Sequence, residues 1–146
     1  MEKAIIVDLD GTLADITHRV HHVQSTKKNW KAFYEAIPHD VPNGWCIELI
    51  LAMKGRGYQI LFLTGRDDLH MEKSREWLSR HAIPFDRLYM RKVGDHRQDD
   101  VVKSEIYQRE IKNQYEILFV VEDRLKVVEM WRRIGLTCLQ CEWGDF

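Results

Sequence analysis

Two aspartates that directly follow an apolar run are the residues of this sequence most suited to chemistry. Asp8 and Asp10 come after Ala4–Val7, and Gly11 comes after them. An uninterrupted apolar run is typical of a strand that is buried on both faces of a parallel sheet. In open α/β sheets, ligands bind in the crevice beyond the carboxyl ends of the strands. The position therefore favours a role in a reaction over a role in supporting the fold.

Carboxylates with this spacing suit phosphoryl transfer. Asp8 could attack phosphorus and form an aspartyl-phosphate. Asp10 projects to the same side, where it could protonate the leaving oxygen and later accept a proton from water. Because neighbouring carboxylates repel each other, we expect a divalent cation between them and the phosphate, and oxygen ligands favour Mg²⁺. Gly11 would let the backbone turn close to the phosphate.

A second expected strand, 58–63, is followed by groups that can hold a phosphate. Thr64 offers a hydroxyl, Gly65 offers a free backbone N–H, and Arg66 offers a guanidinium that can form two charged hydrogen bonds at once. These three residues are therefore predicted to bind the phosphate of the substrate.

A third expected strand, 117–121, is followed by Glu122 and Asp123, whose carboxylates could bind the metal. Between the second and third of these strands, Asp99 and Lys103 stand one helical turn apart and share a helical face. A lysine at this place could balance the charge of the nucleophile and of the phosphate.

Each of these groups also has an ordinary explanation. An Asp-x-Asp pair is usually solvated surface, and Thr-Gly-Arg is a common turn. Lys103 could be a surface lysine, and Glu122 with Asp123 could cap the following helix. Because each group stands at the end of a strand or helix, their joint order favours the catalytic interpretation.

Strand and helix patterns alternate along the chain. This alternation predicts an α/β fold, with a Rossmann-like parallel sheet and helices on both faces. A chain of 146 residues is expected to form a single domain, 1–146. The expected strands cover 4–7, 58–63, 87–90, 117–121 and a last run from Leu136, and the expected helices cover 47–54, 71–81, 101–111 and 126–134.

Residues 14–44 break this alternation and show no strand pattern. They directly follow the first expected strand, so we expect an insert that lies over the active site. His18, His21 and His22 are predicted to be solvated or to face the substrate, because no carboxylate pattern that would suggest a metal site accompanies them.

Three aromatic residues of the insert, Trp30, Phe33 and Tyr34, stand at helical spacing. This spacing favours the inner, packed face of the insert. A platform on which nucleic-acid bases stack is the alternative, and both interpretations stay open.

Composition limits the possible classes of protein. Lys and Arg number 22 against 23 Asp and Glu, which excludes a basic nucleic-acid-binding tail but not a local basic patch. Three cysteines fit no disulfide framework, and Cys138 and Cys141 favour a strand over half of a zinc site. No apolar run approaches the ~20 residues of a membrane span, and no signal peptide precedes the first strand, so we expect a cytoplasmic protein.

The order of these motifs matches the haloacid dehalogenase superfamily, most of whose members are Mg²⁺-dependent phosphotransferases. In finer detail, residues 94–103, 127–135 and 144–146 resemble the phosphatase half of bacteriophage polynucleotide kinase-phosphatase. The resemblance runs from Lys3 onward and is weakest across 16–42. The kinase half is missing, because the sequence contains no Gly-x-x-x-x-Gly-Lys-Ser/Thr phosphate loop.

The resemblance implies a role for each matching residue. Asp8 would be nucleophile and metal ligand, Asp10 would be the general acid and base and would reach the metal through its carbonyl, and Asp123 would bind Mg²⁺. Arg19 matches an essential arginine, whereas Glu122 stands where the family has a second aspartate. The other matches to functional residues are Thr64 (in place of a serine), Arg66, Asp99 and Lys103.

The resemblance further implies removal of 3′-phosphates from RNA or DNA ends, with a partner kinase and ligase on other chains. The segment 64–103 is too short for a large closing cap, so a polymer end could reach the nucleophile. A phosphatase of small phosphoesters is the alternative; the complete catalytic set disfavours a third possibility, a non-enzymatic end binder. A basic stretch could touch backbone phosphates and consists of Arg91, Lys92, His96 and Arg97.

Overall fold

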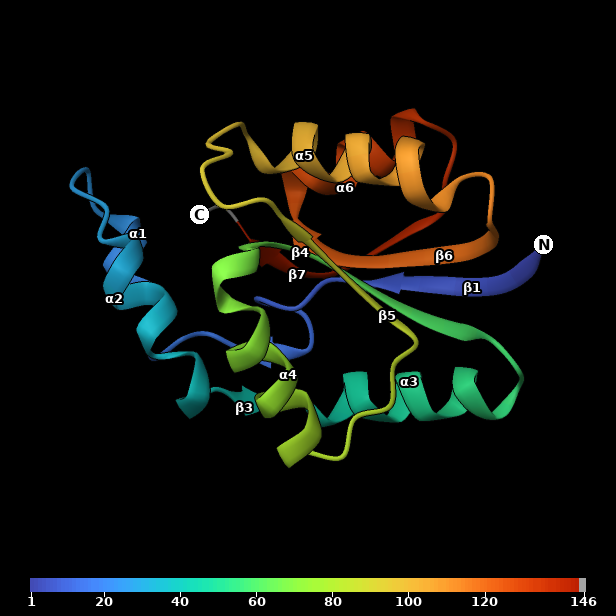
Figure 1. Cartoon of the computed structure of the whole chain (residues 1–146), viewed down its shortest axis with the longest axis horizontal. Helices are drawn as coiled ribbons and strands as arrows, with labels where there is room; N and C mark the ends of the chain where they lie inside the picture. Colours follow the sequence, from blue (N-terminus) through green and yellow to red (C-terminus); the bar gives the residue numbers. More distant parts are fainter. Residues whose placement is uncertain (145–146) are drawn as a thin grey trace.

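The structure is a computed structural model that describes residues 1–144. Asp145 and Phe146, which belong to the family-like segment 144–146, lie outside the described residues. Within the described chain, a five-stranded parallel sheet in the order β5-β4-β1-β6-β7 forms the centre of the molecule (Figure 1). Its strands are β1 (Glu2–Val7), β4 (Gln59–Asp67), β5 (Arg87–Arg91), β6 (Tyr115–Arg124) and β7 (Cys138–Gly144).

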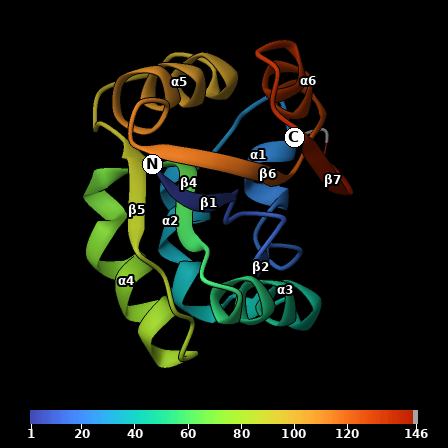
Figure 2. The ribbon, with the colours of Figure 1, turned by 90° about the vertical axis from the view of Figure 1, so that its right-hand side faces the viewer.

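Helices cover both faces of this sheet, as the alternating sequence pattern predicts (Figures 1 and 2). On one face lie α5 (Asp99–Ile106) and α6 (Leu125–Arg133). On the other face lie α3 (Gly44–Gly55) and α4 (Met71–Arg80). The prediction of an α/β fold with a Rossmann-like parallel sheet is therefore confirmed.

The central strand β1 explains why the first apolar run is uninterrupted. Ile5 and Val7 belong to the hydrophobic cluster that includes residues of α3 and α4, whereas Ala4 and Ile6 belong to the cluster that includes residues of α5 and α6. All four side chains are almost completely buried. Burying each of the larger ones contributes roughly 1.5–3 kcal/mol, so the strand is anchored from both sides.

Two strands are longer than the apolar pattern predicts. β4 continues through Asp67 and β6 continues through Arg124, so the polar residues of both lie inside the strands rather than in loops after them. The prediction of a helix over 101–111 is also corrected: α5 ends at Ile106, and a π-helical turn, η3 (Tyr107–Ile111), follows it. Backbone pairing continues into polar residues at the carboxyl end of the sheet, whereas an apolar pattern in the sequence stops where those residues begin.

The insert leaves the sheet at the carboxyl ends of the strands (Figure 1). The expectation that it has no strand is wrong, because β2 (Ala14–Asp15) and β3 (Val41–Pro42) pair antiparallel at its base. Strands of two residues are too short to leave a periodic pattern in a sequence. Between them lie α1 (His21–Gln24), α2 (Trp30–Glu35) and the 3₁₀ turn η1 (Ile37–His39), and a further 3₁₀ turn, η2 (Asp68–His70), precedes α4.

Two other expectations concern cysteines and membranes. Cys138 and Cys141 lie in β7, which confirms that this segment is a strand. Among the helices formed by residues 1–144, none is long and apolar enough to cross a bilayer.

Candidate active site

A buried lysine connects the carboxylates that the sequence singles out. Lys103 on α5 donates from Nζ to Asp8 Oδ1 at 2.9 Å and to Glu122 Oε2 at 2.8 Å. The same Nζ lies 3.5 Å from Asp99 Oδ2, one helical turn back. Although burial disfavours its charged form, these carboxylates raise the pKa of Lys103 above its ordinary value. The alternative that Lys103 is a surface lysine is wrong, because its side chain is buried.

Three buried carboxylates gather beside this lysine. Asp8, Glu122 and Asp123 each place an oxygen within 4.8 Å of the others. Burial, followed by electrostatic repulsion, raises the pKa of Glu122 to about 7 and that of Asp123 to about 8. The pKa of Asp8 also rises well above its usual range through burial and the Glu122 charge, although Lys103 opposes the rise.

Fully ionised, this cluster would carry more negative charge than Lys103 can balance, which agrees with the raised pKa values of its acids. Its donors are all carboxylate oxygens, which suit a hard divalent cation such as Mg²⁺. Glycines let the backbone come close to acidic side chains here. A Cβ at Gly11, where φ is +83°, would collide with the Asp123 carboxylate of the cluster, and a Cβ at Gly65 would collide with the neighbouring Asp99. The residues present therefore fit a metal site.

Asp10 lies in a separate network of ion pairs. Its Oδ1 accepts from Arg19 NH2 and from Arg66 NH2, each at 2.6 Å. Asp40 of the insert closes the network, because its Oδ2 lies 2.7 Å from Arg19 NH2 and 3.5 Å from Arg66 NH2. Although burial opposes the effect, the Arg66 and Arg19 guanidinium groups hold the pKa of Asp10 well below its usual range.

Both arginines are thus bound to carboxylates and do not line the catalytic pocket. Arg66 also donates from NH1 to Ser74 Oγ on α4 at 2.9 Å, and Arg19 lies over the Phe33 ring with its guanidinium carbon 4.3 Å from the centroid. The structure brings Arg19 and Arg66 to Asp10. Asp40 left no signal in the sequence, because an isolated acidic residue in an irregular segment is ordinary.

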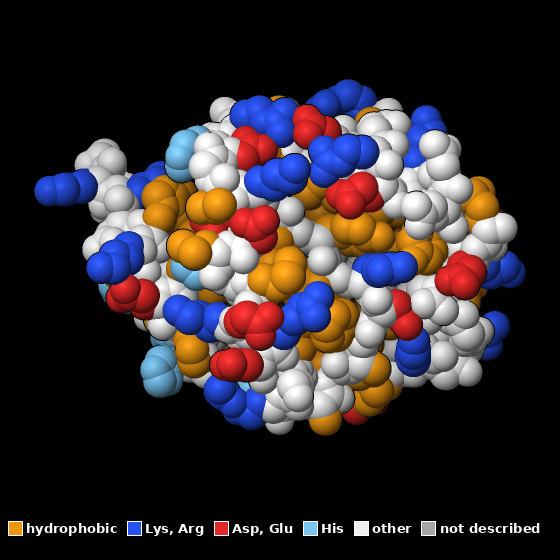
Figure 3. All heavy atoms as spheres, viewed as in Figure 1, with side chains coloured by type: hydrophobic (Ala, Val, Ile, Leu, Met, Phe, Trp, Pro, Cys, Tyr) orange, Lys and Arg blue, Asp and Glu red, His pale blue; other side chains and the backbone are white. Residues whose placement is uncertain are grey.

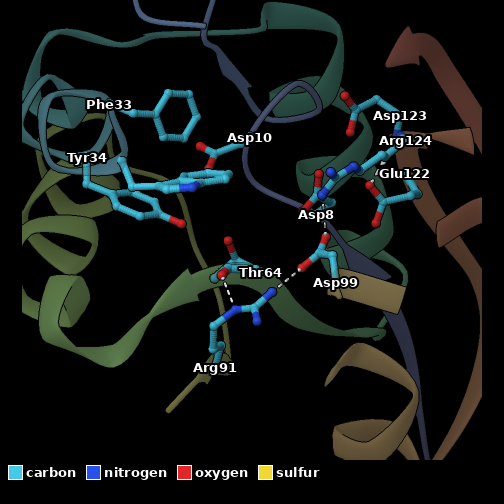
Figure 4. A pocket seen from close by; sticks show the side chains of 12 residues that line it. Asp8, Asp10, Phe33, Tyr34, Thr64, Arg91, Asp99, Glu122, Asp123 and Arg124 are labelled. Carbon is cyan, nitrogen blue, oxygen red and sulfur yellow. Dashed lines mark hydrogen bonds and ion pairs between the residues drawn. The ribbon is translucent and has the colours of Figure 1, made fainter. Parts of the chain in front are cut away.

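The pocket itself is small, about 60 Å³, and opens beside Asp8 and Asp10 (Figure 4). Thr64 and Gly65 from β4 form part of its wall, as expected of phosphate-binding residues, and Thr64 Oγ1 accepts from the backbone N–H of Arg66 at 3.2 Å. The remaining lining residues are Trp30, Phe33, Tyr34, Arg91, Asp99, Glu122, Asp123 and Arg124.

Two arginines, Arg91 and Arg124, hold Asp99 in place. The sequence did not indicate that either of them lines the pocket. Arg91 donates from Nε to the Gly65 carbonyl at 2.9 Å, and its NH2 lies 3.3 Å from Asp99 Oδ1. Arg124 NH1 lies 3.7 Å from Asp99 Oδ2, and Figure 4 shows its side chain reaching toward Asp99 from β6. The sequence did offer one sign for Arg124, because this arginine directly follows the Glu122-Asp123 pair.

The histidines of the insert differ from one another. His18 places Nε2 2.6 Å from Asp40 Oδ1, so a carboxylate does accompany it, from a distant position in the sequence. His21 is exposed and His22 half-buried, with ring centroids 4.0 Å apart.

Glu122 does not cap the helix that follows it. α6 begins at Leu125, its N-cap residue is Arg124, and no side chain caps it. Glu122 instead accepts from Lys103 and lies in the acidic cluster, which favours a role in the reaction.

A pair of Glu122 variants tests this role. We expect Glu122→Ala to lower kcat by about tenfold or more, because a group that supports charge in the transition state is removed. Glu122→Asp should keep a substantial part of the activity, since the charge remains. Turnover and Tm are measured together, with Glu116→Ala, an exposed glutamate of the same strand, as the control. A fall in Tm without a fall in kcat would assign Glu122 to stability alone.

A Rossmann-like sheet with Asp-x-Asp-Gly-Thr after its central strand, a buried lysine and two further acids defines a phosphatase of the haloacid dehalogenase type. Residues 2–146 match the family model described as the polynucleotide kinase PNKP phosphatase domain. The chain belongs to this family and is, by class, a phosphoric monoester hydrolase.

Individual relatives agree with this assignment. The chain is 26% identical over 139 residues to a putative bifunctional polynucleotide kinase/RNA ligase of Autographa californica nuclear polyhedrosis virus, covering 92% of this chain and 18% of that protein. It is 34% identical to a chain of the Pnkp1/Rnl/Hen1 complex, with a TM-score of 0.86, covering 100% of this chain and 48% of that one. The chain therefore spans less than half the length of either relative.

A more distant structure shares only the fold. The D,D-heptose 1.7-bisphosphate phosphatase of B. bronchiseptica is 13% identical with a TM-score of 0.63, covering 94% of this chain and 79% of that one.

Proposed function

We propose that this chain is a Mg²⁺-dependent polynucleotide 3′-phosphatase that prepares broken RNA or DNA ends for ligation. The observation that carries the proposal is the buried Asp8 carboxylate, held by Lys103 at the wall of a pocket the size of a phosphoryl group. Membership of the polynucleotide kinase PNKP phosphatase family supports nucleic-acid ends as the substrate class.

In the proposed reaction, Oδ2 of Asp8, the oxygen that Lys103 does not hold, attacks phosphorus, forming a P–O bond to the carboxylate while the bond from phosphorus to O3′ breaks. Asp10 in its protonated form donates a proton to the leaving O3′. Water then attacks the aspartyl-phosphate, Asp10 accepts a proton from that water, and inorganic phosphate leaves as Asp8 is restored. Lys103 balances the charge of Asp8 throughout.

The state of Asp10 separates its two proposed roles. Paired with Arg19 and Arg66, it is ionised, which is the form required of the base that accepts a proton from water. Acting as the acid requires it to take up a proton against both guanidinium groups. The ion pairs support the proposal that Arg19 and Arg66 orient the carboxylate of Asp10.

We propose Asp8, Glu122 and Asp123 as the residues that hold Mg²⁺, with the backbone carbonyl of Asp10 as a further ligand. When bound, the cation would neutralise the phosphate and the surrounding carboxylates. The side chain of Asp10 lies with the arginines, so its carbonyl is the part available to the metal.

Other chains are proposed to supply the neighbouring steps of repair. The similar chains are named as a polynucleotide kinase/RNA ligase and as part of a Pnkp1/Rnl/Hen1 RNA repair complex, which supports a kinase and a ligase as partners. The second candidate function is a phosphatase of nucleotides or other small phosphoesters, which would use the same catalytic residues.

The position of the phosphate on the substrate decides between these two functions. We expect release of phosphate from 3′-phosphorylated oligonucleotides to exceed release from 5′-phosphorylated ones by about tenfold or more, because the surroundings of the sugar select the end. Added salt should weaken binding of oligomers more than of 3′-mononucleotides, since only oligomers contact the protein with further phosphates. Equal rates on both ends, with no length-dependent salt effect, would assign the chain to small phosphoesters.

A further inference from the structure

The catalytic pocket opens into a larger cavity. The pocket, at about 60 Å³, is several times smaller than a cavity that encloses a small molecule, so it suits the phosphoryl end of a substrate rather than a nucleoside. The adjoining cavity measures about 390 Å³, within the range of roughly 300–1,000 Å³ typical of small-molecule sites. Both share lining residues Trp30, Tyr34, Arg91, Asp99 and Arg124. A nucleoside whose phosphate reaches Asp8 must therefore lie in the larger cavity.

One wall of this cavity is the end of a stack of aromatic rings. His70 stacks on Tyr34 with centroids 4.6 Å apart and planes at 29°, and Tyr34 stacks on Trp30 with centroids 5.9 Å apart and planes at 26°. Trp30 keeps 43% of its surface exposed, whereas Phe33, one turn along α2, is buried. The two interpretations of the insert aromatics thus apply to different residues: Phe33 packs inward, and Trp30 faces the cavity.

The charges around the cavity do not replace this apolar contact. Arg97 is paired with Asp95 at 2.8 Å and with Glu105 at 2.6 Å, and Arg91 is paired with Asp99. Arg91 and Arg97 of the predicted basic stretch are therefore paired with carboxylates of the protein. Figure 3 shows acidic and basic side chains interspersed on the face it draws, without a continuous basic surface. Lys28 Nζ lies over the Trp30 ring, 5.7 Å from its centre.

We propose that the larger cavity binds the 3′-terminal nucleoside of the substrate, with its base stacked on Trp30. The base extends the stack of His70, Tyr34 and Trp30, and it takes the place over the Trp30 ring that the flexible Lys28 side chain occupies in the structure. This subsite rests on the proposed 3′-phosphatase function and adds what recognises the terminal nucleotide. Every base has a flat aromatic face, so the contact binds all bases without reading their sequence.

The test compares two oligonucleotides that differ only in the base of the terminal nucleotide. Both carry a 3′-phosphate; in one the last nucleotide has its base, and in the other it is a tetrahydrofuran abasic residue. We expect Trp30→Ala to raise KM about tenfold or more for the substrate with the base, the effect of removing one stacked ring. KM for the abasic substrate and kcat for both should stay unchanged, and Trp30→Phe should retain most of the affinity.

The matched control is Trp45→Ala, because Trp45 is 47% exposed and lines neither cavity. An equal rise in KM on both substrates for Trp30→Ala, or no rise on either, would overturn the subsite while leaving 3′-phosphatase activity established. If the wild type hydrolysed glycerol phosphate but neither oligonucleotide, the proposed function would fail, and the subsite with it. The abasic substrate also reports misfolding, since a misfolded variant loses kcat on both.

Discussion

Asp8→Asn should stop phosphate release while leaving the protein folded. An amide oxygen is a poor nucleophile, so losing the covalent step should lower the rate by several orders of magnitude. The variant should remain folded because Asp8 lies beside Glu122 and Asp123, and an amide there removes repulsion among buried carboxylates. Phosphate release from a 3′-phosphorylated oligonucleotide and Tm measure the two effects.

Asp15→Asn provides the matched control, since Asp15 is an exposed aspartate at the base of the insert. It should keep wild-type activity. If Asp8→Asn retained a sizeable fraction of the wild-type rate, Asp8 would not be the nucleophile, and the reaction would need another attacking group.

Chelation of divalent cations should silence the enzyme, and Mg²⁺ should restore it. Lys103 alone cannot balance Asp8, Glu122 and Asp123 together with a dianionic phosphate, so the substrate is repelled without the cation. Binding of the cation to the folded state alone should also stabilise the fold, by about 2.7 kcal/mol when the cation concentration is 100 times Kd. This stabilisation should raise Tm. Activity after EDTA treatment and Tm with and without Mg²⁺ are the two measurements.

Asp123→Asn separates the metal from a general salt effect. This variant should lose the Mg²⁺-dependent rise in Tm, whereas Asp68→Asn, a change outside the acidic cluster, should keep it. Activity that survived exhaustive chelation would overturn the metal assignment.

The central strands could be predicted because their apolar runs are uninterrupted, although Leu118 of β6 remains exposed. The run Ala4–Val7 and its counterparts in β4 and β6 carry the period-independent apolar pattern of parallel strands. The pair β2–β3 could not be predicted, since its strands hold two residues each and form only through a long-range contact. The π-helical turn after α5 also has no periodic signature that separates it from a continuing helix.

The residue types of the candidate site could be predicted better than their partners. Asp8, Lys103 and Asp123 stand at ends of strands and helices, which the sheet topology brings together. The ion pairs of Arg19 and Arg66 could not be predicted, because a sequence shows which residues are cationic but not which carboxylates they meet. Asp40, which pairs with both, lies 21 residues from Arg19 and becomes visible only when the insert is folded.

The ion pairs of Asp10 bear on how a substrate enters. Arg19 and Asp40 belong to the insert, whereas Asp10 and Arg66 belong to the body of the domain, so these pairs fasten the insert to the sheet. Lifting the insert would separate buried opposite charges and release the carboxylate of Asp10 from its orientation. If a substrate needed the insert to open, its entry would therefore remove the ion pairs that orient the carboxylate of Asp10. For the proposed substrate, we therefore expect the end of a nucleic-acid strand to enter an opening that is already formed, with the insert as a wall rather than a lid.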